Sequence, residues 1–148
     1  MMLPARSALV LLGRIWAFPC TLVGYLLVLI SGATKYKDCD YVSWYMMKRK
    51  ILYDPMVAIT FGTVVLLKRD VGDYQPSLEA HEHTHVVQFM EFSVLFWIVY
   101  GIDFVVKLVR YGDFMQAYHG LVFEQAAVRS QAAHALKCKA EADAKGIV

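Results

Sequence analysis

The feature that most restricts how this chain can fold is an uncharged apolar run near its amino terminus. From Ile15 to Ala33 the residues IWAFPCTLVGYLLVLISGA include no Asp, Glu, Lys or Arg. A helix of about 20 apolar residues crosses about 30 Å of hydrocarbon, so this run predicts a transmembrane helix. Arg14 precedes the run and Lys35 follows it, where long cationic side chains reach lipid headgroups. The small residues of Ser31–Gly32–Ala33 leave a cleaved secretory signal as the alternative.

Composition also favours a lipid bilayer as a partner. Hydrophobic residues make up 58% of the 148 residues and charged residues only 19%, with a mean hydropathy of +0.43. This length gives one domain. We therefore expect a membrane anchor or signal at 1–34 and a single domain at 35–148. Five cations between Lys35 and Lys50 outnumber Arg6 and Arg14 before the run, which predicts a single-pass protein with its domain in the cytoplasm.

Two other classes of protein are excluded by the charged residues and the cysteines. The formal net charge of +2 comes from scattered basic residues, so no nucleic acid is expected as a partner. Cys20, Cys39 and Cys138 lack C-x-x-C spacing. They therefore predict neither a disulfide framework nor a thiolate zinc site.

Patterns after the first apolar run indicate an α+β domain. The segment 41–53 fits a strand or a short interfacial helix. The β-branched segment 56–69 predicts one strand, kinked or bulged at Gly62. A polar connection at 70–76 then leads into a helix that begins near Leu78.

The second half of the chain predicts two further helices. A second apolar segment at 92–109 contains Asp103 and Lys107, which are costly inside a bilayer, so a helix in the interface or packed on the domain is favoured over a span. The residues around Gly112 interrupt the helical pattern. An alanine-rich helix is expected from Gln116 to Lys139.

The helix predicted after Leu78 contains the pattern H-E-x-x-H. His81 and His85 are four residues apart, about 40° around a helix, so their imidazoles share one face and can bind one metal ion. His83 points about 200° away from His81 and is not expected to be a ligand. Gln88 returns to the face of His81, where it can line the site or orient a ligand.

Glu82 completes a pattern in which two histidines bind Zn²⁺ and the glutamate acts as general base. Zinc makes water acidic, with a pKa near about 7, and a carboxylate beside it can accept the proton and pass it to a leaving amine. His81, His85 and Glu82 therefore predict metal-dependent hydrolysis.

A catalytic zinc commonly has three protein ligands, so a third must come from elsewhere in the chain. Glu124 is the preferred residue, because Ala126 and Ala127 would let its helix approach the H-E-x-x-H helix closely. Glu91 is about 240° around the helix from His85 and is set aside. The other residues considered are Asp103, Asp113, His119 and His134.

The order AITFGTVVLL, HEHTHVVQ and FEQAA resembles the gluzincin zinc metallopeptidases, which have a thermolysin-like core. The resemblance covers about half of the chain. It implies a minimal zincin-like domain with a strand along the substrate cleft, zinc ligands His81, His85 and Glu124, Glu82 as the general base, and a peptide or protein as substrate. Two features depart from the family: the separation of His85 from Glu124 is longer, and Val128 stands where thermolysin-like enzymes have an aspartate. Tyr118 and His119 are the residues to test for stabilising an oxyanion.

Two other functions compete with this interpretation, a di-iron enzyme and a non-enzymatic membrane protein. The run Glu82–His85 is also E-x-x-H, half of a di-iron carboxylate motif, but no second E-x-x-H follows Glu124. The non-enzymatic alternative is a small membrane protein with a structural metal or none, which acts through protein interactions. The favoured interpretation is a membrane-associated zinc peptidase.

Overall fold

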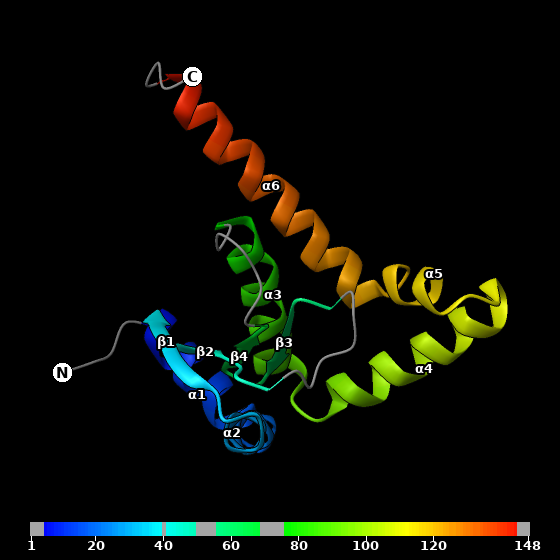
Figure 1. Cartoon of the computed structure of the whole chain (residues 1–148), viewed down its shortest axis with the longest axis horizontal. Coiled ribbons are helices and arrows are strands. Elements are labelled where there is room, and N and C mark those ends of the chain that lie inside the picture. Colours follow the sequence, from blue (N-terminus) through cyan, green and yellow to red (C-terminus); the bar gives the residue numbers. More distant parts are fainter. Residues whose placement is uncertain (1–4, 40, 50–55, 69–75, 145–148) are drawn as a thin grey trace.

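The computed structural model describes residues 5–39, 41–49, 56–68 and 76–144, and within them the chain is an α+β protein (Figure 1). Two helices precede the strands and four follow them. The elements are α1 (Ala5–Trp16), α2 (Phe18–Ser31), β1 (Thr34–Cys39), β2 (Val42–Met46), β3 (Ala58–Phe61), β4 (Val64–Leu67), α3 (Pro76–Phe92), α4 (Leu95–Tyr111), α5 (Phe114–His119) and α6 (Val122–Ala144). The predicted α+β class is confirmed.

The strands form one mixed sheet of order β1-β2-β4-β3. β1 and β2 pair antiparallel, β2 and β4 pair parallel, and β3 returns antiparallel to β4. The segment at 41–53 therefore contains a strand, and of the two alternatives the helix is wrong. β3 is an edge strand of this sheet and lies next to α3.

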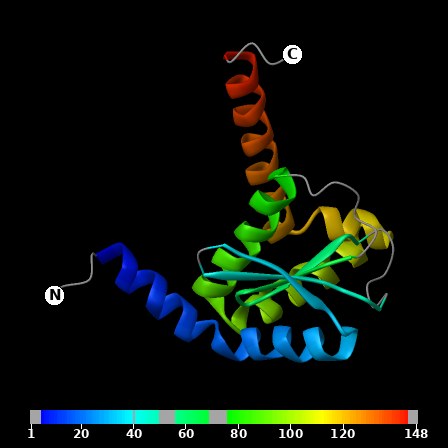
Figure 2. The ribbon, with the colours of Figure 1, turned by 60° about the vertical axis from the view of Figure 1, so that its left-hand side comes forward.

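Helices cover both faces of the sheet (Figure 2). On one face Trp44, Val65 and Leu67 pack with Val86 of α3. On the other face Val64 and Leu66 pack with Leu27 and Val28 of α2, among other residues. Alternate residues of β4 thus point to opposite faces, and all four are buried, as expected for a strand enclosed on both sides.

The continuous helix predicted from Ile15 to Ala33 is wrong, because the chain bends at Ala17 between α1 and α2. Pro19 lies in the first turn of α2. Its nitrogen has no hydrogen to donate to the carbonyl of Ile15, and its ring would collide with that carbonyl in a straight helix.

Among the described residues, no single helix is both long and apolar enough to cross a membrane. Two bent pairs of helices together have sufficient length and apolar composition. They are Ser7–Trp16 with Phe18–Ser31, and Ser77–Phe92 with Leu95–Tyr111.

The single strand predicted at 56–69 is also wrong, since a tight turn at Gly62 and Thr63 divides it into β3 and β4. Gly62 has a φ of +60°, a left-handed conformation that glycine adopts at little cost. Thr21 of α2 packs directly on this turn, and its hydroxyl accepts a hydrogen bond from the Thr63 amide at 3.1 Å. The hairpin is therefore fixed to the helix behind the sheet.

The predicted helices of the second half are present with different ends. α3 begins at Pro76, two residues before the expected start. Pro76 was predicted as the end of the polar connection at 70–76, and the rest of that connection lies outside the described residues. The second apolar segment, predicted at 92–109, forms α4 only from Leu95, because Phe92 is the last residue of α3. α4 ends at Tyr111 with Gly112 as its C-cap, where the interruption was expected. The helix predicted at 116–139 is wrong as one element, because α5 and α6 are separate helices with Gly120 and Leu121 between them. Leu121 is fully buried, which fixes this break in the chain.

Candidate metal centre

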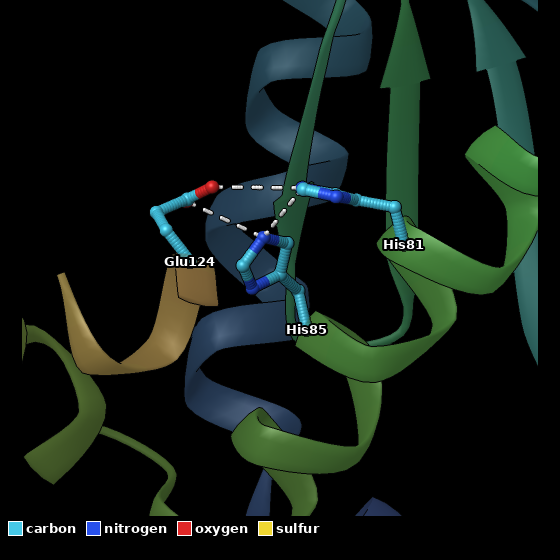
Figure 3. Close-up of side chains that lie close together, drawn as sticks. All are labelled: His81, His85 and Glu124. Atoms are coloured by element: carbon cyan, nitrogen blue, oxygen red, sulfur yellow. Dashed lines mark hydrogen bonds and ion pairs between the residues drawn. The ribbon is translucent and has the colours of Figure 1, made fainter. Parts of the chain in front are cut away.

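Packing of α3 against α6 assembles a group of three potential metal ligands. His81 and His85 lie one turn apart on α3, and Glu124 lies in the first turn of α6 (Figure 3). One ligand atom from each residue lies within 4.8 Å of the others. His85 and Glu124 are buried, and His81 is mostly buried. The three residues selected from the sequence therefore meet at one point in the fold.

Distances within this group match those between the ligands of a zinc ion. The Nε2 atoms of His81 and His85 are 3.2 Å apart. The Glu124 carboxylate lies 3.5 Å from Nε2 of His81 and 3.4 Å from Nε2 of His85. Ligand atoms about 2.0–2.1 Å from a tetrahedral zinc lie about 3.3–3.4 Å from one another. Two imidazoles and a carboxylate are also the ligand types that catalytic zinc sites use.

Gln88 determines which nitrogen of His85 carries a proton. The Gln88 side-chain amide donates to the carbonyl oxygen of Phe123 at 3.2 Å. Its oxygen Oε1 therefore faces Nδ1 of His85 at 2.9 Å, and Nδ1 must be the donor. In a neutral imidazole the Nε2 lone pair then points at the Glu124 carboxylate, which is repulsive unless a cation lies between them. Gln88 thus orients the His85 ring, one of the two roles that its position on the helix predicts.

Either a proton or a metal ion can provide that positive charge. Burial lowers the pKa of His85, but its hydrogen bond to Glu124 and the charges of Glu82 and Glu124 raise it by more. Burial raises the pKa of Glu124, while His81 and His85 lower it by more, to about 2. Nδ1 of His81 is buried and has no hydrogen-bond partner among the described residues. The site thus requires positive charge at the point where the two Nε2 atoms and the carboxylate meet.

Glu82 lies beside the potential metal ligands on α3, and its carboxylate is hydrogen-bonded to strand β3. It is 4% exposed, and its Oε2 accepts a hydrogen bond of 2.6 Å from the hydroxyl of Thr60 on β3. Glu82, His81 and His85 all line the same cavity. A buried carboxylate with one strong hydrogen bond keeps a fixed position and still has lone pairs to accept a proton.

Two tyrosines stand next to Glu124. The hydroxyl of Tyr100 on α4 donates to Glu124 Oε1 at 3.4 Å. Burial, followed by the negative charges of Glu124 and Glu82, raises the pKa of Tyr118. Tyr118 therefore remains a protonated hydrogen-bond donor at neutral pH. It is one of the two residues that the sequence indicates for oxyanion stabilisation, and it lies on the cavity wall together with the other, His119.

The cavity in front of the three ligands has a volume of about 620 Å³. Its wall is mainly apolar. The residues that form it come from β3, α3, α4, α5 and α6 and include Ile59, Phe89, Phe96, Trp97, Phe104, Met115 and Val128. A space of this size can enclose several side chains of a bound molecule.

The remaining acidic and histidine residues considered from the sequence have other contacts. His83 is exposed, and its Nε2 lies 3.0 Å from the Tyr41 hydroxyl, as expected for a residue outside the site. Asp103 accepts from the Val122 amide at 2.9 Å and pairs with Lys107. Asp113 caps α5 through the Gln116 amide, and Nδ1 of His134 lies near the Cys138 thiol.

Sequence reasoning did not identify Thr60 or Tyr100. Thr60 is one of several β-branched residues in a strand, and Tyr100 lies within an apolar helix. Nothing local distinguishes them, because their partners, Glu82 and Glu124, are brought to them only by the tertiary fold.

Comparison with protein-family models, with curated proteins and with solved structures found no match. The function is therefore inferred from the geometry of this site.

Proposed function

We propose that this protein is a zinc-dependent peptidase with a minimal zincin-like fold, in which His81, His85 and Glu124 bind the metal and Glu82 is the general base. The observation that carries the proposal is the meeting of Nε2 of His81, Nε2 of His85 and the Glu124 carboxylate within a few ångströms of one another. Gln88 and the Phe123 carbonyl orient the His85 imidazole so that it faces His81 and a buried carboxylate at ligand-to-ligand distances. A metal ion satisfies all three groups together, whereas a proton on Nε2 satisfies only one imidazole.

When bound, zinc supplies Lewis acidity, which makes water acidic near pH 7 and polarises a carbonyl oxygen. The residues around the site would provide proton transfer and a hydrogen bond to the developing negative charge. Glu82, held by Thr60, accepts a proton from the attacking water and delivers it to the departing amine nitrogen. Tyr118, protonated and on the cavity wall, can donate a hydrogen bond to the oxygen on which negative charge develops.

The apolar cavity supports a substrate with large hydrophobic side chains. Phe89, Phe96 and Trp97 pack against one another, and they line the cavity together with residues 58–60 of β3. A small polar substrate would leave this apolar surface exposed to water, at a cost of about 25 cal/mol per Å². We therefore expect cleavage next to aromatic or long aliphatic residues.

The first test is metal content. The full chain, purified in detergent and dialysed against zinc, should retain close to one zinc ion per chain by atomic emission spectroscopy. Glu124→Ala should lose most of this zinc, while His83→Ala should retain it. Equal zinc content in wild type and Glu124→Ala would exclude the proposed ligand set.

The second test separates catalysis from metal binding. Glu82→Gln keeps the shape of the side chain and removes its basicity, so zinc content should stay near that of wild type. Hydrolysis of a fluorogenic peptide library rich in aromatic residues should fall by about 10²-fold or more, as expected for a lost general acid–base group. If wild type binds zinc but neither protein cleaves any peptide in the library, the metal is structural and the enzymatic proposal is wrong.

A further inference from the structure

Helix α2 is apolar on the side that faces away from the protein. Its buried residues are small or polar: Cys20, Thr21, Gly24 and Ser31. Most of its large residues are exposed, and Leu29 is 77% exposed. The helices of most globular proteins in water have the opposite arrangement, with the apolar stripe towards the core. Small and hydroxyl residues at helix contacts are instead typical of helices surrounded by lipid.

The small residues of α2 are required by close packing. A Cβ atom at Gly24 would lie 2.7 Å from Cβ of Val64 and 3.0 Å from the carbonyl oxygen of Phe61. The hydroxyl of Thr21 donates to the Ala17 carbonyl at 3.1 Å, within the helix. The inward face of α2 is thus fully used by the protein, and most of its large side chains lie on the outer face.

Helix α4 has the same inverted pattern. Its charged pair, Asp103 and Lys107, is turned towards the protein, and Asp103 also accepts from the Val122 amide of α6. Its outer face consists of large aliphatic residues at helical spacing: Ile98, Ile102, Val105, Val106 and Val109, with Val109 82% exposed. Ionisable residues that pair with each other on the inner face of a helix are typical of segments in contact with lipid.

The charges bordering these faces match a phospholipid surface. Within α1, α2 and α4 the only acidic residue is Asp103, which is paired on the inner side. Each of the three helices has an exposed arginine near its carboxyl end. These are Arg14 on α1, Arg110 on α4, and Arg49, whose guanidinium donates to the Ile30 carbonyl of α2 at 3.2 Å. Arginines at the end of an apolar face can bind lipid phosphate.

A second copy of the chain fits these faces less well. In a twofold dimer the same patch would face itself, and the described parts of α1, α2 and α4 offer no unpaired acidic side chain for the arginines of the other copy, since Asp103 is paired with Lys107. We propose that the outer faces of α1, α2 and α4 are a lipid-contact surface that binds the acyl chains and phosphate headgroups of a bilayer. In Figure 1 these three helices lie along the lower side of the molecule, and α6 extends away from them.

Tryptophan fluorescence tests the proposal directly. Trp16 and Trp97 are 53% and 39% exposed, whereas Trp44 is 2% exposed inside the core. The full chain is reconstituted into vesicles containing equal amounts of phosphatidylcholine and phosphatidylglycerol, with or without bromine on the acyl chains. Bromine quenches only tryptophans that touch the chains, so wild type should be strongly quenched. The double variant Trp16→Phe/Trp97→Phe, which retains Trp44, should show little quenching.

Matched substitutions provide a second measurement that does not depend on fluorescence. Leu29→Asp and Val109→Asp place a charge on the proposed surface, and Leu136→Asp places one at a comparably exposed position on α6, where the leucine is 69% exposed. In flotation with the same vesicles, each of the first two should weaken partitioning by about tenfold or more, the value expected for losing one buried aliphatic side chain. Leu136→Asp should partition like wild type.

Two results would overturn the proposal. The first is absence of bromine quenching in wild type, with the chain remaining in the lipid-free fraction after flotation. The second is a stable dimer in sedimentation experiments without lipid that Leu29→Asp or Val109→Asp converts to monomer, since that result assigns the surface to a second copy. Neither outcome depends on whether the metal site is catalytic.

Discussion

Replacing Gly62 by alanine should destabilise the fold far more than its small size implies. Gly62 has a φ of +60°, and an alanine there costs about 1–2 kcal/mol in backbone conformation alone. The added Cβ would also lie 2.2 Å from Oγ1, 2.5 Å from N and 2.8 Å from Cα of Thr21. Two of these are backbone atoms, so a side-chain rotation cannot relieve the contact, and α2 must move away from the hairpin.

That displacement adds two further costs. Overpacking of a close contact typically costs about 1–3 kcal/mol. Moving Thr21 also lengthens the hydrogen bond from the Thr63 amide to its hydroxyl, and a buried donor left without a partner costs about 1–3 kcal/mol. The total for Gly62→Ala is about 3 kcal/mol or more, a large part of the about 5–15 kcal/mol by which most domains are stable.

Two other glycines separate the backbone cost from the contact cost. Gly32 has the same φ of +60°, but a Cβ added there would meet no atom of the described residues within 4 Å, so Gly32→Ala should cost only about 1–2 kcal/mol. Gly101 lies inside α4 with equally open space, and Gly101→Ala should be neutral or stabilising by up to about 1 kcal/mol. Urea unfolding of the three variants in one detergent, followed by circular dichroism, measures these differences. Equal losses for Gly62→Ala and Gly32→Ala would refute the packing of α2 on the hairpin.

Two further predictions concern the metal site. Gln88→Leu removes the hydrogen-bond acceptor at Nδ1 of His85 and should weaken zinc binding by about 10–100-fold in a chelator competition assay. His83→Ala is the control and should bind zinc like wild type. Loss of zinc affinity in His83→Ala instead of Gln88→Leu would contradict the assigned orientation of His85. Zinc at about 100 times its Kd should stabilise the chain by about 2.7 kcal/mol and raise the thermal midpoint by about 5–10 °C, and a chelator should reverse this shift. Glu124→Ala should show a much smaller zinc-dependent shift, and an undiminished one would mean that the metal binds elsewhere.

The parts of the site that sequence reasoning predicted are those fixed by local geometry. His81, Glu82 and His85 lie within one continuous helix, so helical periodicity alone gives their relative directions. The same periodicity excluded His83 and placed Gln88 on the face of His81, where it contacts His85. Glu124 could be selected because carboxylates suit zinc and the alanines after it permit close packing; Ala127 is indeed fully buried.

The parts that were missed depend on contacts between distant segments. A glycine in a β-branched run fits either a bulge or a turn. The turn at Gly62 depends on contact with Thr21 of α2, which is 42 residues before its hydrogen-bond partner Thr63. The break at Leu121 likewise follows from burial of that side chain and from Asp103 accepting the Val122 amide. The bend at Ala17 could have been predicted locally, because Pro19 disfavours a straight helix at this point. The prediction of one continuous helix gave more weight to the length of the apolar run.

The position of Glu124, the proposed third ligand, on α6 has a consequence for the order in which this protein would acquire its metal. A newly made chain presents His81 and His85 as soon as α3 forms, but this half of the site has no carboxylate ligand. Glu124 joins it only after α4 and α5 have been synthesised and α6 has docked on α3, with the Gln88 amide bonded to the Phe123 carbonyl next to it. The proposed ligand set therefore predicts that tight metal uptake follows completion of the tertiary structure, and that metal bound to partly folded chains exchanges easily.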